Sequence, residues 1–562
     1  MEHHRAETDL DTAALQEDKS LRLSQSPKST RSFGNSKYLF FVFAAFFLAA
    51  HLPTLSQPFV NLESWYGGAA RLISEGKFAD GLRYLDTAIA NPVGSVLGIV
   101  PFYWLFGVSE FSARLSSLLA GVCLLGVLYY YCRSESNGTS LLAACVVGLN
   151  PLLWVYSGIA YSDVPFILLI TATILTAAYA SRTANMRLHL LGSALLGASA
   201  LIKYNAVVAA PAIAAITLIE ARYRNQEWGR VLWDWVRVMA LYSAVCLLML
   251  VPYLAAVHRI LGYFMADRYV TSVGLSASSS LPSLTGLRMA ALVTAVGIFC
   301  GPLALFPAAH MAVKFGRLRL LGTLLVASPI AVFVVQKYLE TQNKLGSAFG
   351  EMQLGWTTHL LPKSLEIALG TLLLMAGSIL VAAVVMWSLE NFRTRGYIAI
   401  WLLLGIVLHS LARPTNRYVL FVLPPVALYI ASTYFEPALP MSSQVKRVCL
   451  TASLFLLGCV GLFNSVYFAT EGKAAAEVAW FINRNSLSGI EFQPQNSVQA
   501  HSGYLIRPEL FIRQDSEPPR FTLVTLAAHE SSPNIVYEVP VKILGLVVKR
   551  YAVLRNDGGR PA

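Results

Sequence analysis

The chain has 562 residues, of which 56% are apolar and 13% charged, with a formal net charge of +12. Soluble proteins carry about 25% charged residues, so this chain has too few charges to cover a soluble multidomain enzyme of this length. The mean hydropathy of +0.56 excludes a disordered chain. Because the apolar stretches are longer than the roughly 10 residues of a membrane barrel strand, we expect a polytopic protein of membrane helices.

The basic residues and cysteines narrow the class of partner. The 43 Lys and Arg residues are scattered between apolar runs, a pattern typical of the flanks of membrane helices and not of a nucleic-acid-binding face. All seven cysteines lie in or beside apolar segments, which argues against a disulfide framework or a cysteine-based metal site. We therefore expect the lipid bilayer as a partner and no nucleic acid.

Residues 1–36 are polar and predict a disordered tail, whereas 37–468 predict a transmembrane domain. A spanning helix needs about 20 apolar residues, and about thirteen segments come near this length. They are 38–55, 115–132, 139–155, 164–180, 189–202, 206–219, 238–256, 289–309, 320–336, 365–388, 397–411, 419–433 and 448–468.

The segment 93–107 is short, rich in aromatic residues and interrupted by Gly and Pro, so we expect an interfacial or re-entrant helix. If 93–107 does not span the membrane, the loops on the cytoplasmic side have a higher density of Lys and Arg than the loops on the outer side, as the positive-inside rule requires. The N-terminus is then cytoplasmic. The long loops at 56–114, 257–288 and 337–364 face the exterior, as does the tail at 469–562.

That tail opens with the helix-like run KAAAEVAWFINRN and ends with the strand-like runs FTLVTL and IVYEVPVKILGLVVKRYAVL. These patterns predict a small extracytoplasmic α/β domain. The predicted fold class is therefore an all-α polytopic membrane protein with surface helices in its first outer loop and a C-terminal α/β domain.

The first outer loop holds the first candidate site residue, Glu63, which precedes an amphipathic helical pattern. A carboxylate there is a candidate general base for a hydroxyl acceptor, or alternatively an acid that complements the helix dipole. Tyr66, Arg71 and Asp86 of the same loop are candidate substrate contacts.

Further charged residues emerge on the same predicted side. Asp163 starts a membrane helix and is a second candidate acid, although Asp before Pro at a helix start is also a good capping arrangement. Lys203 interrupts two apolar runs and needs an anionic partner such as a lipid phosphate, unless it snorkels from a helix end. Two converging carboxylates, Glu63 and Asp163, could also hold a divalent metal.

Arg413 and Arg417 lie together in LARPTNRYVLFVLPP, at the outer end of two adjacent predicted spans. Two guanidinium groups on the side poorer in positive charge indicate bidentate phosphate recognition, and Tyr418 beside them is a further candidate contact. Carboxylates and cations at the outer membrane face suit a reaction between a membrane-anchored phosphate and a polar acceptor.

Five segments in order along the chain carry a resemblance to a known family. They are ESWYGGAARLISEGKFADGLRYLD, FYWLFGVSEFSARLSSLLAG, NPLLWVYSGIAYSDVPFILL, LLGASALIKYNAVVAAP and NRYVLFVLPPVALYIA. With them the chain resembles the GT-C superfamily of integral membrane glycosyltransferases. Within it, the chain is similar to the protein O-mannosyltransferase-like branch (glycosyltransferase family 39-like), which includes the lipid A aminoarabinose transferases.

The resemblance implies inverting transfer of a sugar from a polyprenyl-phosphate donor to an extracytoplasmic lipid, glycan or protein, in a bacterial inner membrane. It implies Glu63 as the acceptor-activating base and Asp163 as the second acid. Lys203, Arg413 and Arg417 are then candidates for the donor phosphate, and Arg114 belongs to one of the matching segments.

Two departures from the family pattern keep other classes open. The usual Asp-Glu pair is Leu62-Glu63 here, and the family's Glu-Lys-Pro-Pro stretch is reduced to Asn91-Pro92. An inactive GT-C homologue that acts as a scaffold is one alternative. A multipass transporter is the other, although transporters place ionisable groups near mid-membrane, whereas here they crowd at helix ends.

Overall fold

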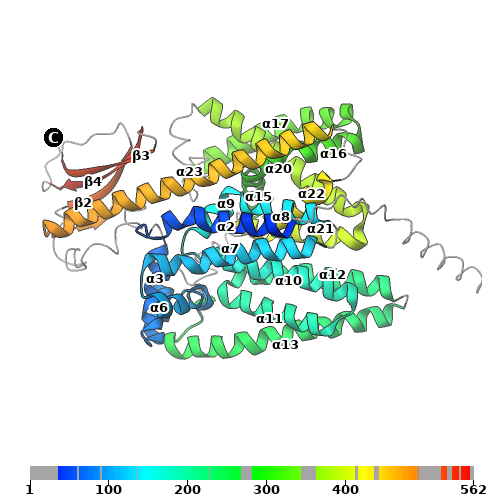
Figure 1. Ribbon diagram of the computed structural model, residues 1–562, viewed down its shortest axis with the longest axis horizontal. Coiled ribbons are helices and arrows are strands. Elements are labelled where there is room, and N and C mark those ends of the chain that lie inside the picture. The colour runs from blue at the N-terminus through cyan, green and yellow to red at the C-terminus, as the bar shows by residue number, and fades with distance from the viewer. Residues whose placement is uncertain are drawn as a thin grey trace, which may run out of the picture.

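Most described residues of the computed structural model are helical, and a four-stranded sheet lies near the C-terminus (Figure 1). The structure describes residues 36–59, 62–88, 91–133, 136–225, 227–266, 281–342, 363–411, 416–435, 442–488, 490–492, 521–527, 534–543 and 546–556. Residues 1–35 of the predicted tail at 1–36, residues 267–280 of the loop at 257–288 and residues 343–362 of the loop at 337–364 lie outside the described residues, as does Arg413.

Ten helical segments among the described residues are long and apolar enough to cross a membrane. They come from α2 (Ser36–Leu55), α7 (Glu110–Cys132), α10 (Asp163–Thr183), η1 with α12 (Tyr204–Val208 and Ala209–Arg224), α13 (Trp228–Leu261), α15 with η2 (Leu281–Cys300 and Gly301–Leu303), α17 (Arg317–Gln342), α20 (Lys363–Glu390), α21 (Phe392–Leu411) and α23 (Ser443–Arg484). The pair α8 (Asn137–Gly148) and α9 (Pro151–Ser157), bent by 67°, makes an eleventh candidate.

The expected count of about thirteen is therefore not confirmed, and the difference lies in two short helices. α11 (Met186–Ile202) and α22 (Val419–Tyr434) are apolar but have only 17 and 16 residues. Almost every residue of α22 is buried, so neighbouring helices and not lipid surround it. A further helix, α16 (Leu305–Phe315), is shorter still.

The first loop forms surface helices, as expected. It contains α3 (Glu63–Ser74), α4 (Phe78–Ala88), α5 (Gly94–Leu97) and α6 (Val100–Phe106). None of the four is long enough to span a bilayer. Trp104, Leu105 and Phe106 are exposed, which suits a membrane interface. α3 and α6 lie at the left end of the bundle in Figure 1.

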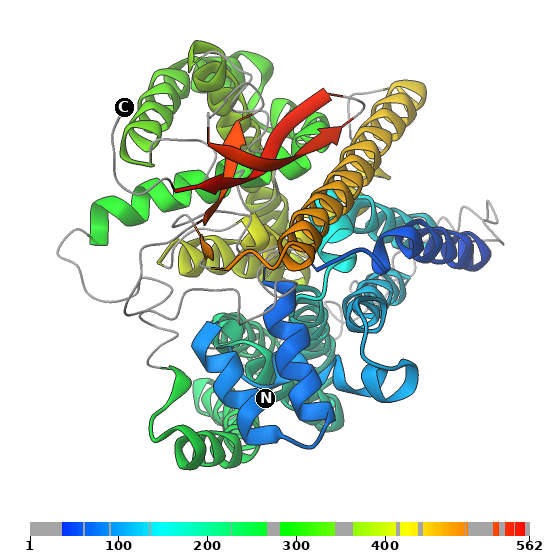
Figure 2. The same ribbon diagram turned by 90° about the vertical axis from the view of Figure 1, so that its left-hand side faces the viewer.

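The sheet lies at the same end, in front of the bundle in Figure 2. α23 has 42 residues, about 63 Å of helix, so it exceeds the roughly 30 Å apolar core of a bilayer. It continues through residue 469, where the tail was expected to begin. The strands are β1 (Ile490–Phe492), β2 (Phe521–Ala527), β3 (Ile535–Ile543) and β4 (Leu546–Arg555).

The order β1-β2-β4-β3 has one parallel pair, β1 with β2, and two antiparallel pairs. Apolar residues of one sheet face, including Leu523, Val541 and Tyr551, pack with Ala475 and Val478 of α23. The C-terminal α/β domain is therefore joined to the bundle by a continuous helix. We call the end that carries α3, α6 and the sheet the sheet end.

Candidate functional site

Glu63 opens α3 at the sheet end and is fully buried. Arg114 of α7 donates from Nε to Oε1 over 2.8 Å and from Nη2 to Oε2 over 2.6 Å. The backbone amide of Ala160 also donates to Oε1, at 2.6 Å. Such a bidentate pair, closed by a further donor, has the geometry that a buried ion pair needs to offset its desolvation.

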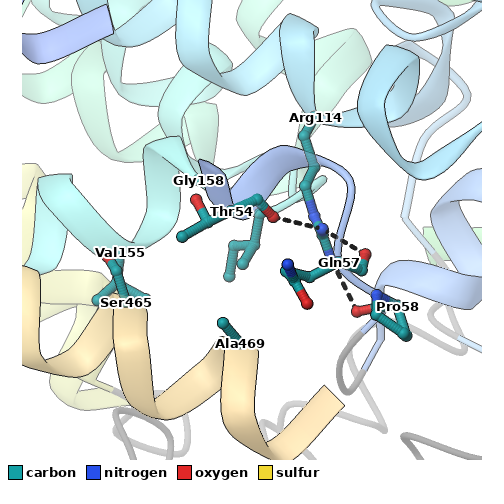
Figure 3. A pocket seen from close by; sticks show the side chains of 9 residues that line it. Thr54, Gln57, Pro58, Arg114, Val155, Gly158, Ser465 and Ala469 are labelled. Carbon is teal, nitrogen blue, oxygen red and sulfur yellow. Dashed lines mark hydrogen bonds between the residues drawn. The ribbon is translucent and has the colours of Figure 1, made fainter. Parts of the chain in front are cut away.

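Arg114 is satisfied on its other side as well. Its guanidinium donates to the backbone carbonyls of Thr54, Leu55, Gln57 and Pro58. Figure 3 shows the contacts to Thr54, Gln57 and Pro58 beside a pocket that Ser465 and Ala469 of α23 line from the opposite side. The pair thus ties the end of α2 to α3, α7 and the segment before α10.

The expected role of Glu63 as the acceptor-activating base stays a prediction, and in this geometry an acceptor hydroxyl would have to share the oxygens of Glu63 with protein donors. Both of its carboxylate oxygens already accept hydrogen bonds from Arg114 or Ala160. A base needs a lone pair within reach of the proton that it removes. The presence of Arg114 in the segment FSARL was the one sequence signal for this pairing.

A second buried pair joins α10 to the end of α11. Asp163 is the first residue of α10, and Lys203 leaves α11 in an extended conformation. Lys203 Nζ lies 2.5 Å from Asp163 Oδ1, and the two side chains are 7% and 5% exposed. Asp163 Oδ2, in contrast, accepts no hydrogen bond from any described residue. The structure therefore brings together two of the predicted site residues and leaves one carboxylate oxygen open.

Tyr66 lies beside this pair. Its hydroxyl accepts hydrogen bonds from Asn91 Nδ2 at 2.8 Å and from Ser162 Oγ at 3.3 Å. Burial, and secondly the negative charge of Asp163, raise the pKa of Tyr66 to about 12, while the positive charge of Arg417 acts in the opposite direction. Tyr66 is thus a neutral hydroxyl near pH 7, within the electrostatic range of both Asp163 and Arg417.

Arg417 and Tyr418 lie in the short helix η3 (Asn416–Tyr418), between α21 and α22. Arg417 is half-buried, and its charge also acts on Tyr161. Tyr418 is buried, with its ring centroid 4.5 Å from that of His409. His409 was not among the predicted residues, although it precedes Arg417 by only eight positions.

The remaining candidate contacts have other surroundings. Arg71 is 58% exposed and lies 3.8 Å from Glu75, one helical turn away. Asp86 is buried and accepts a hydrogen bond from the Tyr263 hydroxyl. No contact among the described residues joins Arg71 or Asp86 to Asp163.

The two carboxylates do not fit a divalent metal. Arg114 occupies Glu63 and Lys203 occupies one oxygen of Asp163, so each acid already faces a cation that would repel the metal. No group of three or more His, Cys, Asp and Glu within the described part of the chain is arranged to hold one.

The bundle of apolar helices and the short surface helices at one end indicate a multi-pass membrane protein. Residues 92–261 match the family described as dolichyl-phosphate-mannose-protein mannosyltransferase. Over this range the match agrees with the superfamily expected from the sequence motifs, and the range includes Arg114, Asp163 and Lys203. No curated protein matches the chain.

Several solved structures are similar at low identity. ArnT from Cupriavidus metallidurans bound to undecaprenyl phosphate is 15% identical, with a TM-score of 0.45, over 93% of this chain and 99% of that one. The archaeal oligosaccharyltransferase AglB from Archaeoglobus fulgidus, in complex with an inhibitory peptide and a dolichol-phosphate, is 13% identical with a TM-score of 0.42. That match covers 86% of this chain and 61% of the other.

Proposed function

We propose that this protein transfers a sugar from a polyprenyl-phosphate donor to an extracytoplasmic acceptor, with inversion at the anomeric carbon. The observation that supports this most is the buried pair of Asp163 and Lys203. The charges of Asp163 and Arg417 both act on Tyr66, which places Arg417 in the same neighbourhood. The family match over 92–261 supports the reaction class.

In this proposal Lys203 and Arg417 stabilise the lipid phosphate as the leaving group. The glycosidic bond breaks and its electron pair stays on the phosphate, so cations assist departure and little general acid is required. Arg413 remains a candidate for the same role. The polyprenyl chain stays in the lipid between the helices, which fits the high apolar content of the protein.

Asp163 is the proposed proton acceptor, because Oδ2 is the open oxygen. An acceptor hydroxyl attacks the anomeric carbon from the face opposite the phosphate and passes its proton to Asp163. One displacement of this kind inverts the configuration. Glu63 becomes a positioning residue, because through Arg114 and the Ala160 amide it fixes the segment that precedes Asp163.

The test uses purified protein in lipid nanodiscs with undecaprenyl-phosphate mannose or glucose and an extract of membrane lipids as acceptor. We expect the wild type to release undecaprenyl phosphate. The Asp163→Asn variant should not release it. Failure of the folded wild type to consume these donors, or any other polyprenyl-phosphate sugar, would contradict the proposal. In that case the replacement of the family's Asp by Leu62 would favour the alternative that the protein is an inactive homologue that acts as a scaffold.

The placement of the sheet end outside the cytoplasm is also part of the proposal, since it rests on the density of Lys and Arg in the predicted inner loops. An alkaline phosphatase joined after residue 562 would be active if that end is exported. In the opposite orientation the same fusion would be inactive in a bacterial cell.

A further inference from the structure

His409 occupies the last turn of α21 and is 3% exposed. Its Nδ1 lies 2.7 Å from the carbonyl oxygen of Gly405. Because a carbonyl oxygen only accepts hydrogen bonds, Nδ1 must carry a proton. In the neutral ring Nε2 is then an acceptor. The backbone of α21 thus selects one tautomer of this side chain.

Two aromatic rings pack against the imidazole. Tyr418 lies 4.5 Å away between ring centroids and Phe421 lies 5.0 Å away. The hydrogen bond that the structure gives this ring uses Nδ1, and Nε2 has no hydrogen bond from the described residues. An acceptor without a protein donor in a largely buried side chain can accept from a ligand or a bound water.

His409 belongs to the same neighbourhood as the buried pair. The positive charge of Lys203 acts on it electrostatically, and α21 contacts η1, which begins directly after Lys203. Two acceptor atoms near Lys203 are therefore open to a donor: Nε2 of His409, whose ring bonds the backbone only through Nδ1, and the buried Oδ2 of Asp163.

The chemistry of these two atoms differs from that of the neighbouring cations. A phosphate offers mainly acceptor oxygens, which suit Lys203 and Arg417 and do not satisfy an imidazole lone pair. A sugar offers hydroxyl donors. Resting on the proposed function, we propose that His409 Nε2 accepts a hydrogen bond from a sugar hydroxyl of the donor and thereby recognises the sugar separately from the lipid phosphate.

The experiment compares binding of two probes, undecaprenyl phosphate and undecaprenyl-phosphate mannose, to the full chain in nanodiscs. His409→Phe keeps an aromatic ring against Tyr418 and removes both nitrogens. We expect it to weaken binding of the mannose-bearing lipid about 10-fold, equivalent to one lost hydrogen bond. Binding of undecaprenyl phosphate should change by less than about twofold.

Two further variants separate recognition from packing. His409→Gln restores an acceptor near the position of Nε2 and should recover most of the sugar-dependent affinity. His189→Phe changes another buried histidine of the bundle, about 21 Å along α11 from Lys203, and should leave both affinities unchanged. A similar loss for both lipids in His409→Phe, or no loss, would overturn the inference.

The same measurements distinguish the inference from the proposed function. If the wild type binds the mannose-bearing lipid no more tightly than undecaprenyl phosphate, and a glucose-bearing lipid gives the same result, sugar recognition by His409 is refuted. If the contrast between lipids depends on His409 but no sugar is transferred, the inference holds and the proposed function fails. Where transfer occurs, His409→Phe should raise KM for the donor more than it lowers kcat.

Discussion

Two buried acid–base pairs lie close together at the sheet end, and they differ in one respect. In the pair of Glu63 and Arg114, both carboxylate oxygens and all three guanidinium nitrogens have hydrogen-bond partners. In the pair of Asp163 and Lys203, one carboxylate oxygen has none among the described residues. Burial and charge are alike, so they do not distinguish the pair that we propose to be structural from the pair that we propose to be reactive.

What distinguishes the pairs is the number of lone pairs left unoccupied. A fully satisfied pair holds backbone segments together, because each additional partner makes its geometry harder to change. A pair with one open oxygen retains a place for a substrate proton. The comparison therefore predicts opposite effects of mutation, with stability affected at the first pair and activity at the second.

The largest expected effect is on stability, from Arg114→Met. Removal of the guanidinium leaves Glu63 buried without its partner and frees four backbone carbonyls, which should cost about 3–5 kcal/mol. The measurement is thermal unfolding of the purified protein in detergent, followed by intrinsic fluorescence. Arg83→Met, which breaks an exposed pair with Asp80, is the matched control and should unfold near the wild-type temperature.

The second prediction concerns activity, from Asp163→Asn. This change keeps the size of the side chain but removes the proton acceptor, so the rate of sugar transfer should fall by about 100-fold or more. The thermal midpoint should decrease less than in Arg114→Met. Glu63→Gln supplies the comparison: if it lowers turnover as much as Asp163→Asn while stability is unchanged, the assignment of the two acids is reversed.

The class of fold could be predicted from the sequence, because the length of each apolar segment and the distribution of charges along the chain are local properties. The sequence located the surface helices at 93–107 from their Gly, Pro and aromatic residues, and the C-terminal strands from their alternation. The predicted number of spans is not confirmed, because α11 and α22 are apolar but short. The apolar residues of α22 face other helices, whereas Leu190 and Leu191 of α11 are exposed, and hydropathy does not distinguish protein from lipid.

The site was harder to predict, because its chemistry depends on which residues meet across the bundle. Glu63 and Asp163 look equivalent in the sequence, since each is an acid at a helix start. Only the distant partners Arg114 and Lys203, 51 and 40 positions away, make them different. His409 carried no usable signal, because its role depends on which of its ring nitrogens the backbone of α21 occupies.

A third prediction sharpens the contrast within the second pair. Lys203→Met removes the positive charge but keeps an apolar chain of similar length. We expect transfer to fall about 10-fold, with weaker binding of undecaprenyl phosphate, because a charge-assisted hydrogen bond to the phosphate is lost. Lys203→Arg should retain part of the binding. Unchanged affinity for undecaprenyl phosphate in Lys203→Met would restrict Lys203 to fixing Asp163.

The smallest effect is expected from Arg71→Ala in α3, a residue of the same loop as Glu63. Arg71 is 58% exposed and its partner Glu75 is 42% exposed, and such surface pairs contribute little in water. The thermal midpoint should stay within a few degrees of the wild-type value, and kcat/KM should stay within about twofold of it. A loss of transfer comparable to Lys203→Met, at unchanged stability, would show that the donor or acceptor extends over the outer face of α3. The reactive region would then be larger than the buried pair and His409.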